Sequence, residues 1–165
     1  MKNKIIEGQL TFSFTEPNAT KYDEWSFYRN QFNAVCGGTK AVDLLYLEQQ
    51  NFWLIEIKDY RQHTRTKTID LADEIALKVR DTLAGLVAAQ VNANEQIERD
   101  FAKEALKKKR IRAVLHLEQP IHTSRLFPRA INPADVKLKL RQKVRAIDTH
   151  PLVVDQKNKM LWSVT

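Results

Sequence analysis

Residues 41–58 read AVDLLYLEQQNFWLIEIK, and this stretch decides the fold. Its two apolar runs, 41–47 and 52–58, are separated by four residues, which is long enough only for a hairpin connection. Both runs are apolar on both faces, as expected of central strands that are covered on either side. They nevertheless carry Asp43, Glu56 and Lys58. Because buried charge is costly unless it is paired or binds a metal, these three residues indicate a site.

The hairpin register follows from the alternation of side chains along a strand. Glu56 and Lys58 project from one face, and Asp43 shares that face if it lies opposite Glu56. This pairing places Leu47 opposite Phe52 and puts the two carboxylates about 5 Å apart across the ladder. Carboxylate pairs provide the hard oxygen ligands that Mg²⁺ prefers, with Mn²⁺ as an alternative. The sequence therefore predicts a divalent-metal site on this hairpin.

The segments around the hairpin predict the rest of the fold. Glycine and small residues at 85–89 predict close packing of a helix. The hydrophobic periodicities predict strands over 4–14, 110–117, 152–154 and 160–164, and helices over 22–32, 71–106 (with a bend at 92–94) and 132–145. This order predicts an α/β fold with a central mixed β-sheet flanked by helices, formed by residues 1–165 as a single domain.

The spacing of the three charged residues resembles a known signature. An aspartate, twelve intervening residues and then Glu-x-Lys resembles the PD-(D/E)XK nuclease superfamily, although Val42 stands where the signature has proline. The resemblance extends over residues 22–117. It implies a restriction endonuclease-like fold and a magnesium-dependent deoxyribonuclease, a hydrolase that cleaves DNA phosphodiesters with metal-activated water.

The resemblance also implies roles for individual residues. Asp43 and Glu56 would bind the metal with the main-chain carbonyl of Ile57, and Lys58 would complete the catalytic set by assisting the attacking water. Glu24 is the best-placed further acidic ligand. A plain alternative is an ion pair of Glu56 with Lys58 or with a neighbouring residue, in a catalytically inactive nucleic-acid-binding or protein-interaction module on the same fold.

The charge distribution predicts a polyanionic partner. The net charge is +7, and residues 103–145 contain ten more basic than acidic side chains. DNA is therefore the expected partner, and a homodimer would let two sites act on two strands. The candidate phosphate contacts are Arg61, Arg65, Lys67, Lys137 and Arg141.

The composition also bears on membrane association, disulfide bonds and cellular location. No apolar run approaches the length that would span a bilayer, so we expect no membrane partner. Cys36 is the single cysteine and cannot form an intrachain disulfide. The N-terminal residues lack the long apolar region of a secretion signal, which predicts a cytoplasmic protein.

Overall fold

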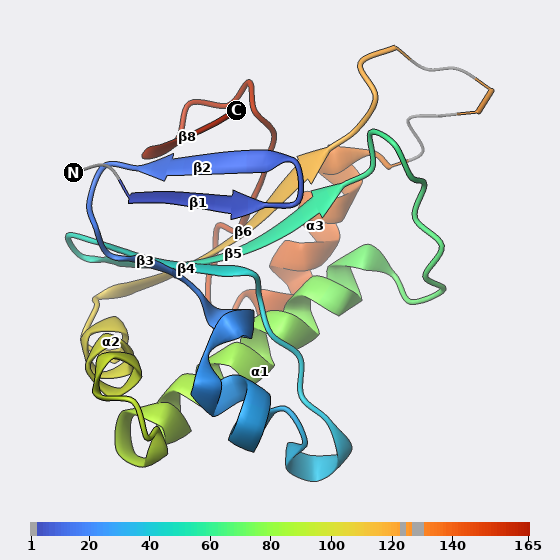
Figure 1. The fold of residues 1–165 in the computed structure, drawn as a ribbon. Coiled ribbons are helices and arrows are strands. Elements are labelled where there is room, and N and C mark those ends of the chain that lie inside the picture. The colour runs from blue at the N-terminus through green and yellow to red at the C-terminus, as the bar shows by residue number, and fades with distance from the viewer. Residues whose placement is uncertain (1–2, 123–124, 127–130) are drawn as a thin grey trace.

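Two β-sheets and a layer of helices make up the molecule (Figure 1). The structure is a computed structural model that describes residues 3–122, 125–126 and 131–165. In this part of the chain the strands are β1 (Asn3–Glu7), β2 (Leu10–Phe14), β3 (Ala19–Lys21), β4 (Leu44–Glu48), β5 (Asn51–Asp59), β6 (Arg110–Glu118), β7 (Leu152–Val154) and β8 (Trp162–Val164). The α-helices are α1 (Leu71–Asn92), α2 (Gln96–Leu106) and α3 (Pro133–Val144). None of the helices described is long and apolar enough to cross a membrane.

The larger sheet has the order β3-β4-β5-β6-β7 and is mixed. β3, β4 and β5 pair antiparallel, whereas β6 and β7 continue the sheet parallel to β5. α1 and α2 connect β5 to β6, and α3 connects β6 to β7, as parallel strands require. Leu47 pairs with Phe52 in the β4–β5 hairpin, so the predicted register is confirmed. The protein is therefore an α/β protein with a central mixed sheet flanked by helices.

The smaller sheet, β1-β2-β8, corrects the prediction for the N-terminal segment. The alternating pattern over 4–14 predicted one strand, but the chain turns at Gly8 and Gln9 to form the β1–β2 hairpin. Gly8 has φ +58°, a left-handed conformation that glycine adopts readily. The two C-terminal strands also do not pair with each other, because β7 joins β6 and β8 joins β2.

The helical predictions were correct in part. The predicted segment 71–106 is divided into α1 and α2 at residues 93–95, next to the predicted bend. The predicted helix over 22–32 is instead a 3₁₀ turn (Tyr22–Glu24) followed by a π-type turn (Tyr28–Phe32). α3 begins after Asn132, whose side chain accepts a hydrogen bond from the Ala134 N–H and caps the helix.

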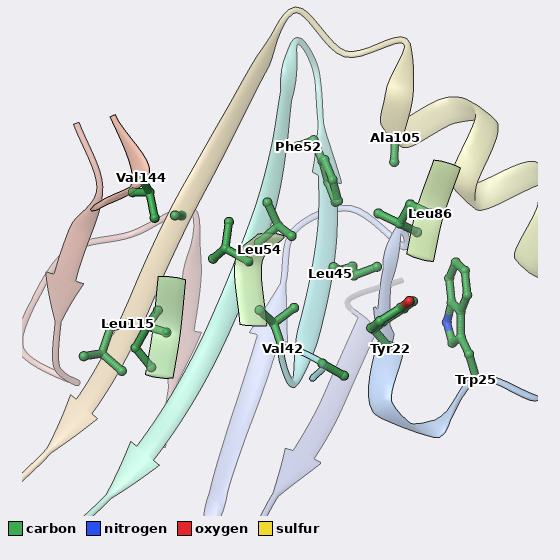
Figure 2. Packing of buried hydrophobic residues seen from close by; sticks show 14 of the residues in the cluster. Tyr22, Trp25, Val42, Leu45, Phe52, Leu54, Leu86, Ala105, Leu115 and Val144 are labelled. Atoms are coloured by element: carbon green, nitrogen blue, oxygen red, sulfur yellow. The ribbon is translucent and has the colours of Figure 1, made fainter. Parts of the chain in front are cut away.

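The core lies on both faces of the larger sheet. Phe52 and Leu54 of β5 face the helices, where Figure 2 shows them beside Leu45 and Leu86. The intervening β5 residues face the smaller sheet and pack with Phe12 and Trp162 among others. Coverage on both sides explains why the strands of the hairpin are apolar throughout.

Gly85 confirms the predicted close packing of α1. A Cβ atom at this position would overlap the Tyr22 hydroxyl and lie 3.1 Å from Cδ1 of Phe32. The absence of a side chain therefore lets α1 approach the turns that precede β4.

Candidate functional site

The hairpin brings Asp43 and Glu56 to the face of the sheet that α1 covers. The ladder between β4 and β5 ends at the pair Leu44 and Ile55, and Asp43 and Glu56 are the next residues beyond this pair. Oδ2 of Asp43 accepts a hydrogen bond of 2.7 Å from the Ile57 N–H. This bond fixes the Asp43 carboxylate beside Glu56, whose side chain is completely buried.

α1 supplies two further charged residues, Glu74 and Lys78, which sequence reasoning did not include. Nζ of Lys78 lies 2.5 Å from Oε1 of Glu56 and 4.0 Å from Oδ1 of Asp43. Nζ of Lys58 lies 2.7 Å from the same Glu56 oxygen and 3.1 Å from Oε1 of Glu74. We name these five residues, Asp43, Glu56, Lys58, Glu74 and Lys78, the buried charge cluster. The sequence offered one signal for Glu74 and Lys78, which is their spacing. They lie one helical turn apart, beside the apolar stripe of α1, so both side chains point to the same side of the helix.

Burial and neighbouring charge shift the pKa values within the buried charge cluster. Burial, together with repulsion from Glu56, raises the pKa of Asp43 to about 7. Burial acts to raise the pKa of Glu74, but hydrogen bonds from Lys67 and Arg65 and the charge of Lys58 lower it to about 2. Burial therefore brings the change in charge of Asp43 close to neutral pH.

The donor set of the cluster is compatible with a hard cation. Oε2 of Glu56 is buried and accepts no hydrogen bond from any described residue. This oxygen and the Asp43 carboxylate are ligands that suit Mg²⁺, which often binds one or two carboxylates and keeps its remaining waters. Against this, the described residues contain no group of three or more His, Cys, Asp or Glu placed to hold a metal. The Lys58 and Lys78 ammonium groups also already neutralise part of the charge.

The acid predicted from the preceding segment lies elsewhere. Glu24 is exposed and forms an ion pair of 3.0 Å with Lys21. The charge of the cluster acts on its neighbour Asp23 instead. Burial raises the pKa of Asp23, and repulsion from Asp43 raises it further. The acid near the cluster is therefore Asp23, one residue before the predicted Glu24 in the same 3₁₀ turn.

The predicted phosphate contacts fall into two groups. Arg61 forms an ion pair with Asp59, and Arg65 and Lys67 both form ion pairs with Glu74. These three side chains are engaged within the protein. Lys137 and Arg141 are exposed on α3 and form no ion pair within the described part of the chain.

Comparison with known proteins gives an informative relative. No family model matches the chain, and no solved structure matches it. A cysteine–tRNA ligase of Neisseria meningitidis serogroup A / serotype 4A (strain DSM 15465 / Z2491) is 37% identical over 163 residues. The match covers 80% of this chain but 23% of the ligase. The chain thus spans less than a quarter of the length of the relative it matches.

This relative overturns the identification as a PD-(D/E)XK nuclease. The predictions of a deoxyribonuclease, of DNA phosphodiester hydrolysis and of a hydrolase are wrong, because the similar protein is a tRNA ligase. The physical reason is that Asp43, Glu56 and Lys58 carry little specificity as a pattern. Their burial is accounted for by ion pairs with α1, because Lys78 pairs with both carboxylates and Glu74 pairs with Lys58. The sequence pattern alone did not show these partners.

Proposed function

We propose that this chain is a tRNA-binding part of a tRNA-charging system. The observation that carries the proposal is its similarity to a segment of a cysteine–tRNA ligase. The similarity supports a role related to tRNA charging. The net charge of +7 is consistent with an RNA partner.

The helix termini favour binding over nucleotide activation. Nucleotide phosphates are commonly held at helix N-termini, where main-chain N–H groups and the helix dipole attract anions. In the described residues, α1, α2 and α3 each carry acidic side chains in the first turn, including Asp73, Glu98 and Asp135. Their negative charge disfavours phosphate at these helix termini. The arrangement therefore suits a part that holds tRNA rather than one that activates an amino acid.

α3 offers the surface for the RNA backbone. Lys137, Arg141 and Arg145 are exposed and recur every four residues, so they form one basic stripe along the helix. On the opposite flank, Lys139 pairs with Asp70 at 2.8 Å and Lys143 with Asp73 at 2.6 Å. The stripe keeps its charge available for phosphates, whereas α1 neutralises the opposite flank.

Replacing the stripe is expected to weaken tRNA binding. The triple variant Lys137→Ala/Arg141→Ala/Arg145→Ala should bind unfractionated tRNA at least about tenfold more weakly at moderate salt. The slope of log affinity against log salt should fall by about one for each phosphate that the variant no longer neutralises. Both quantities can be measured by fluorescence anisotropy with labelled tRNA, with duplex DNA of equal length as the comparison polymer.

The matched control is Lys139→Ala/Lys143→Ala, which removes two positive charges from the same helix. Its tRNA affinity should stay close to that of the wild type, because the two lysines are engaged with α1. Equal losses in the two variants would contradict a specific role for the stripe. Tighter binding of DNA than of tRNA, or no binding of tRNA, would refute the proposed function.

We also propose the restriction endonuclease-like arrangement as the finer description of the fold, without nuclease activity. Its support is the antiparallel β4–β5 hairpin, followed by a helical crossover to the parallel strand β6. A systematic comparison of an experimental structure with that fold would test this description.

A second candidate function is the binding of a divalent cation by Asp43 and Glu56. The observation that favours it is the buried Glu56 oxygen without a hydrogen-bond donor among the described residues. When bound, Mg²⁺ would neutralise the two adjacent carboxylates and stabilise the folded state. Lys78 would keep its contact with the other carboxylate oxygen of Glu56, Oε1.

At pH 8, 10 mM MgCl₂ is expected to raise the melting temperature of the wild type above that in NaCl of equal ionic strength. Asp43→Asn should show no such rise, because the amide lacks the charge that holds the cation. Differential scanning fluorimetry provides the measurement. A similar rise in both proteins would place any bound magnesium elsewhere.

A further inference from the structure

A groove of about 890 Å³ lies between β1, β3 and α2, apart from the buried charge cluster and the basic stripe of α3. In Figure 1 these elements lie near one another on the side opposite the end of β6. Trp25 and Phe101 line the groove and pack edge to face, with ring centroids 5.5 Å apart. Ile6 and Ile97 also line it, and they are 65% and 78% exposed. Large apolar side chains exposed around an apolar groove are typical of an interaction site.

The wall formed by β1 carries unused main-chain hydrogen-bonding groups. Thr11 of β2 exchanges both main-chain hydrogen bonds with Thr165, on the β8 side. Main-chain N–H and C=O groups point to alternate sides of a strand from one residue to the next. The groups of Leu10 and Phe12, on either side of Thr11, therefore point toward β1, where Phe12 pairs with Ile5. The N–H and C=O groups of Lys4 and Ile6 therefore point away from β2, and no described strand pairs with that edge. Such groups can bind the main chain of an extended segment.

The groove is acidic although the protein is basic. Four acids line it, Glu24, Glu98, Asp100 and Glu104, against the lysines Lys4 and Lys21. Glu104 also pairs with Lys107 at 2.8 Å, but both side chains are more than half exposed, so this ion pair is screened by water. Lys21 is already shared between Glu24 and Glu7 of β1. Glu98 is buried, and its two oxygens accept hydrogen bonds of 2.7 and 3.0 Å from the N–H groups of Ser26 and Phe27, with no cation beside it in the described structure. The local charge therefore selects a basic occupant and disfavours RNA.

We propose that this groove binds an extended segment of a partner protein in which apolar residues alternate with Lys or Arg. Apolar side chains of the segment enter between Ile6, Ile97 and Phe101, and its cations pair with Asp100 and Glu104 on α2. Its main chain bonds to the open edge of β1. The site is independent of the proposed tRNA surface.

The probe is a pool of fluorescein-labelled eight-residue peptides with Leu, Ile or Phe at alternate positions and Lys or Arg between them. A matched pool carries Asp or Glu in place of the bases. Anisotropy should detect binding of the basic pool and no binding of the acidic pool. Ile6→Ser/Ile97→Ser should weaken binding of the basic pool at least about tenfold, and Asp100→Lys/Glu104→Lys should do the same.

The matched controls are Val91→Ser and Asp135→Lys, which change an exposed apolar residue of α1 and an exposed acid of α3 outside the groove. Each should retain wild-type affinity for the basic pool within about twofold. The proposal is overturned by failure of the basic pool to bind, by equal losses in the control variants, or by equal binding of the acidic pool. A dimer of the wild type that dissociates in Ile6→Ser/Ile97→Ser would show a second copy as the occupant and would also overturn it. Binding of tRNA should be unchanged in Ile6→Ser/Ile97→Ser, which leaves the charge of the protein as it is.

Discussion

Lys78→Met is expected to lower the free energy of unfolding by about 3 kcal/mol, because it removes one partner of a buried charge network. Lys78 is the cation nearest to Glu56 and the one that reaches Asp43. Without Lys78, Lys58 is the cation that remains beside the carboxylates of Asp43 and Glu56 among the described residues. Lys58 also forms an ion pair with Glu74. Methionine fills similar volume, so the loss reflects charge rather than a cavity. Urea denaturation followed by circular dichroism at pH 8 measures the difference.

The control for this prediction is Lys143→Met on α3. Lys143 also forms a short ion pair, 2.6 Å to Asp73, but both side chains are about two-fifths exposed. Water screens such a pair, so its loss should leave stability nearly unchanged. A loss in Lys143→Met as large as that in Lys78→Met would show that the buried charge cluster has no special importance for stability. An unchanged Lys78→Met protein would lead to the same conclusion.

The half of the cluster that lies on the hairpin could be predicted from the sequence. A strand has a strict two-residue alternation, and the short connection allows few registers, so Asp43, Glu56 and Lys58 could be placed on one face. The other half could not. Whether Lys78 reaches Glu56 depends on how α1 is rotated about its axis above the sheet, and this is set by close packing such as that at Gly85.

The errors in the predicted fold and function also arose because a sequence pattern does not show which segments pack together. The pattern over 4–14 alternates through Gly8, and alternation alone does not distinguish one long strand from two strands joined by a two-residue turn. The nuclease prediction treated the charges on the hairpin as a complete set. Because Glu74 and Lys78 come from α1, later in the chain than the hairpin, the three-residue pattern did not distinguish a catalytic site from an ion-pair network.

The contribution of Asp43 to the stability of the protein is expected to decrease as the pH rises from about 4 to 7. Its pKa is raised from 3.8 to about 7 in the folded state, mainly by burial. Between these two values the folded protein holds a proton that the unfolded chain releases, so the contribution of Asp43 is fully present below pH 3.8 and is lost as the pH rises through 7. The loss is on the order of 4 kcal/mol when complete.

Asp43→Asn isolates this contribution, because other groups titrate over the same range. His116 acts in the opposite direction: burial lowers its pKa from 6.5 to about 4, so its contribution decreases as the pH falls. The asparagine remains neutral, and its side-chain oxygen can still accept the hydrogen bond from the Ile57 N–H. The variant should therefore equal the wild type below pH 3.8 and exceed it by a growing margin up to about pH 7, as measured by urea denaturation at each pH. An Asp43→Asn protein that is less stable than the wild type at pH 8 would mean that the ionised carboxylate is favourable there, as it would be if Lys78 compensated it fully.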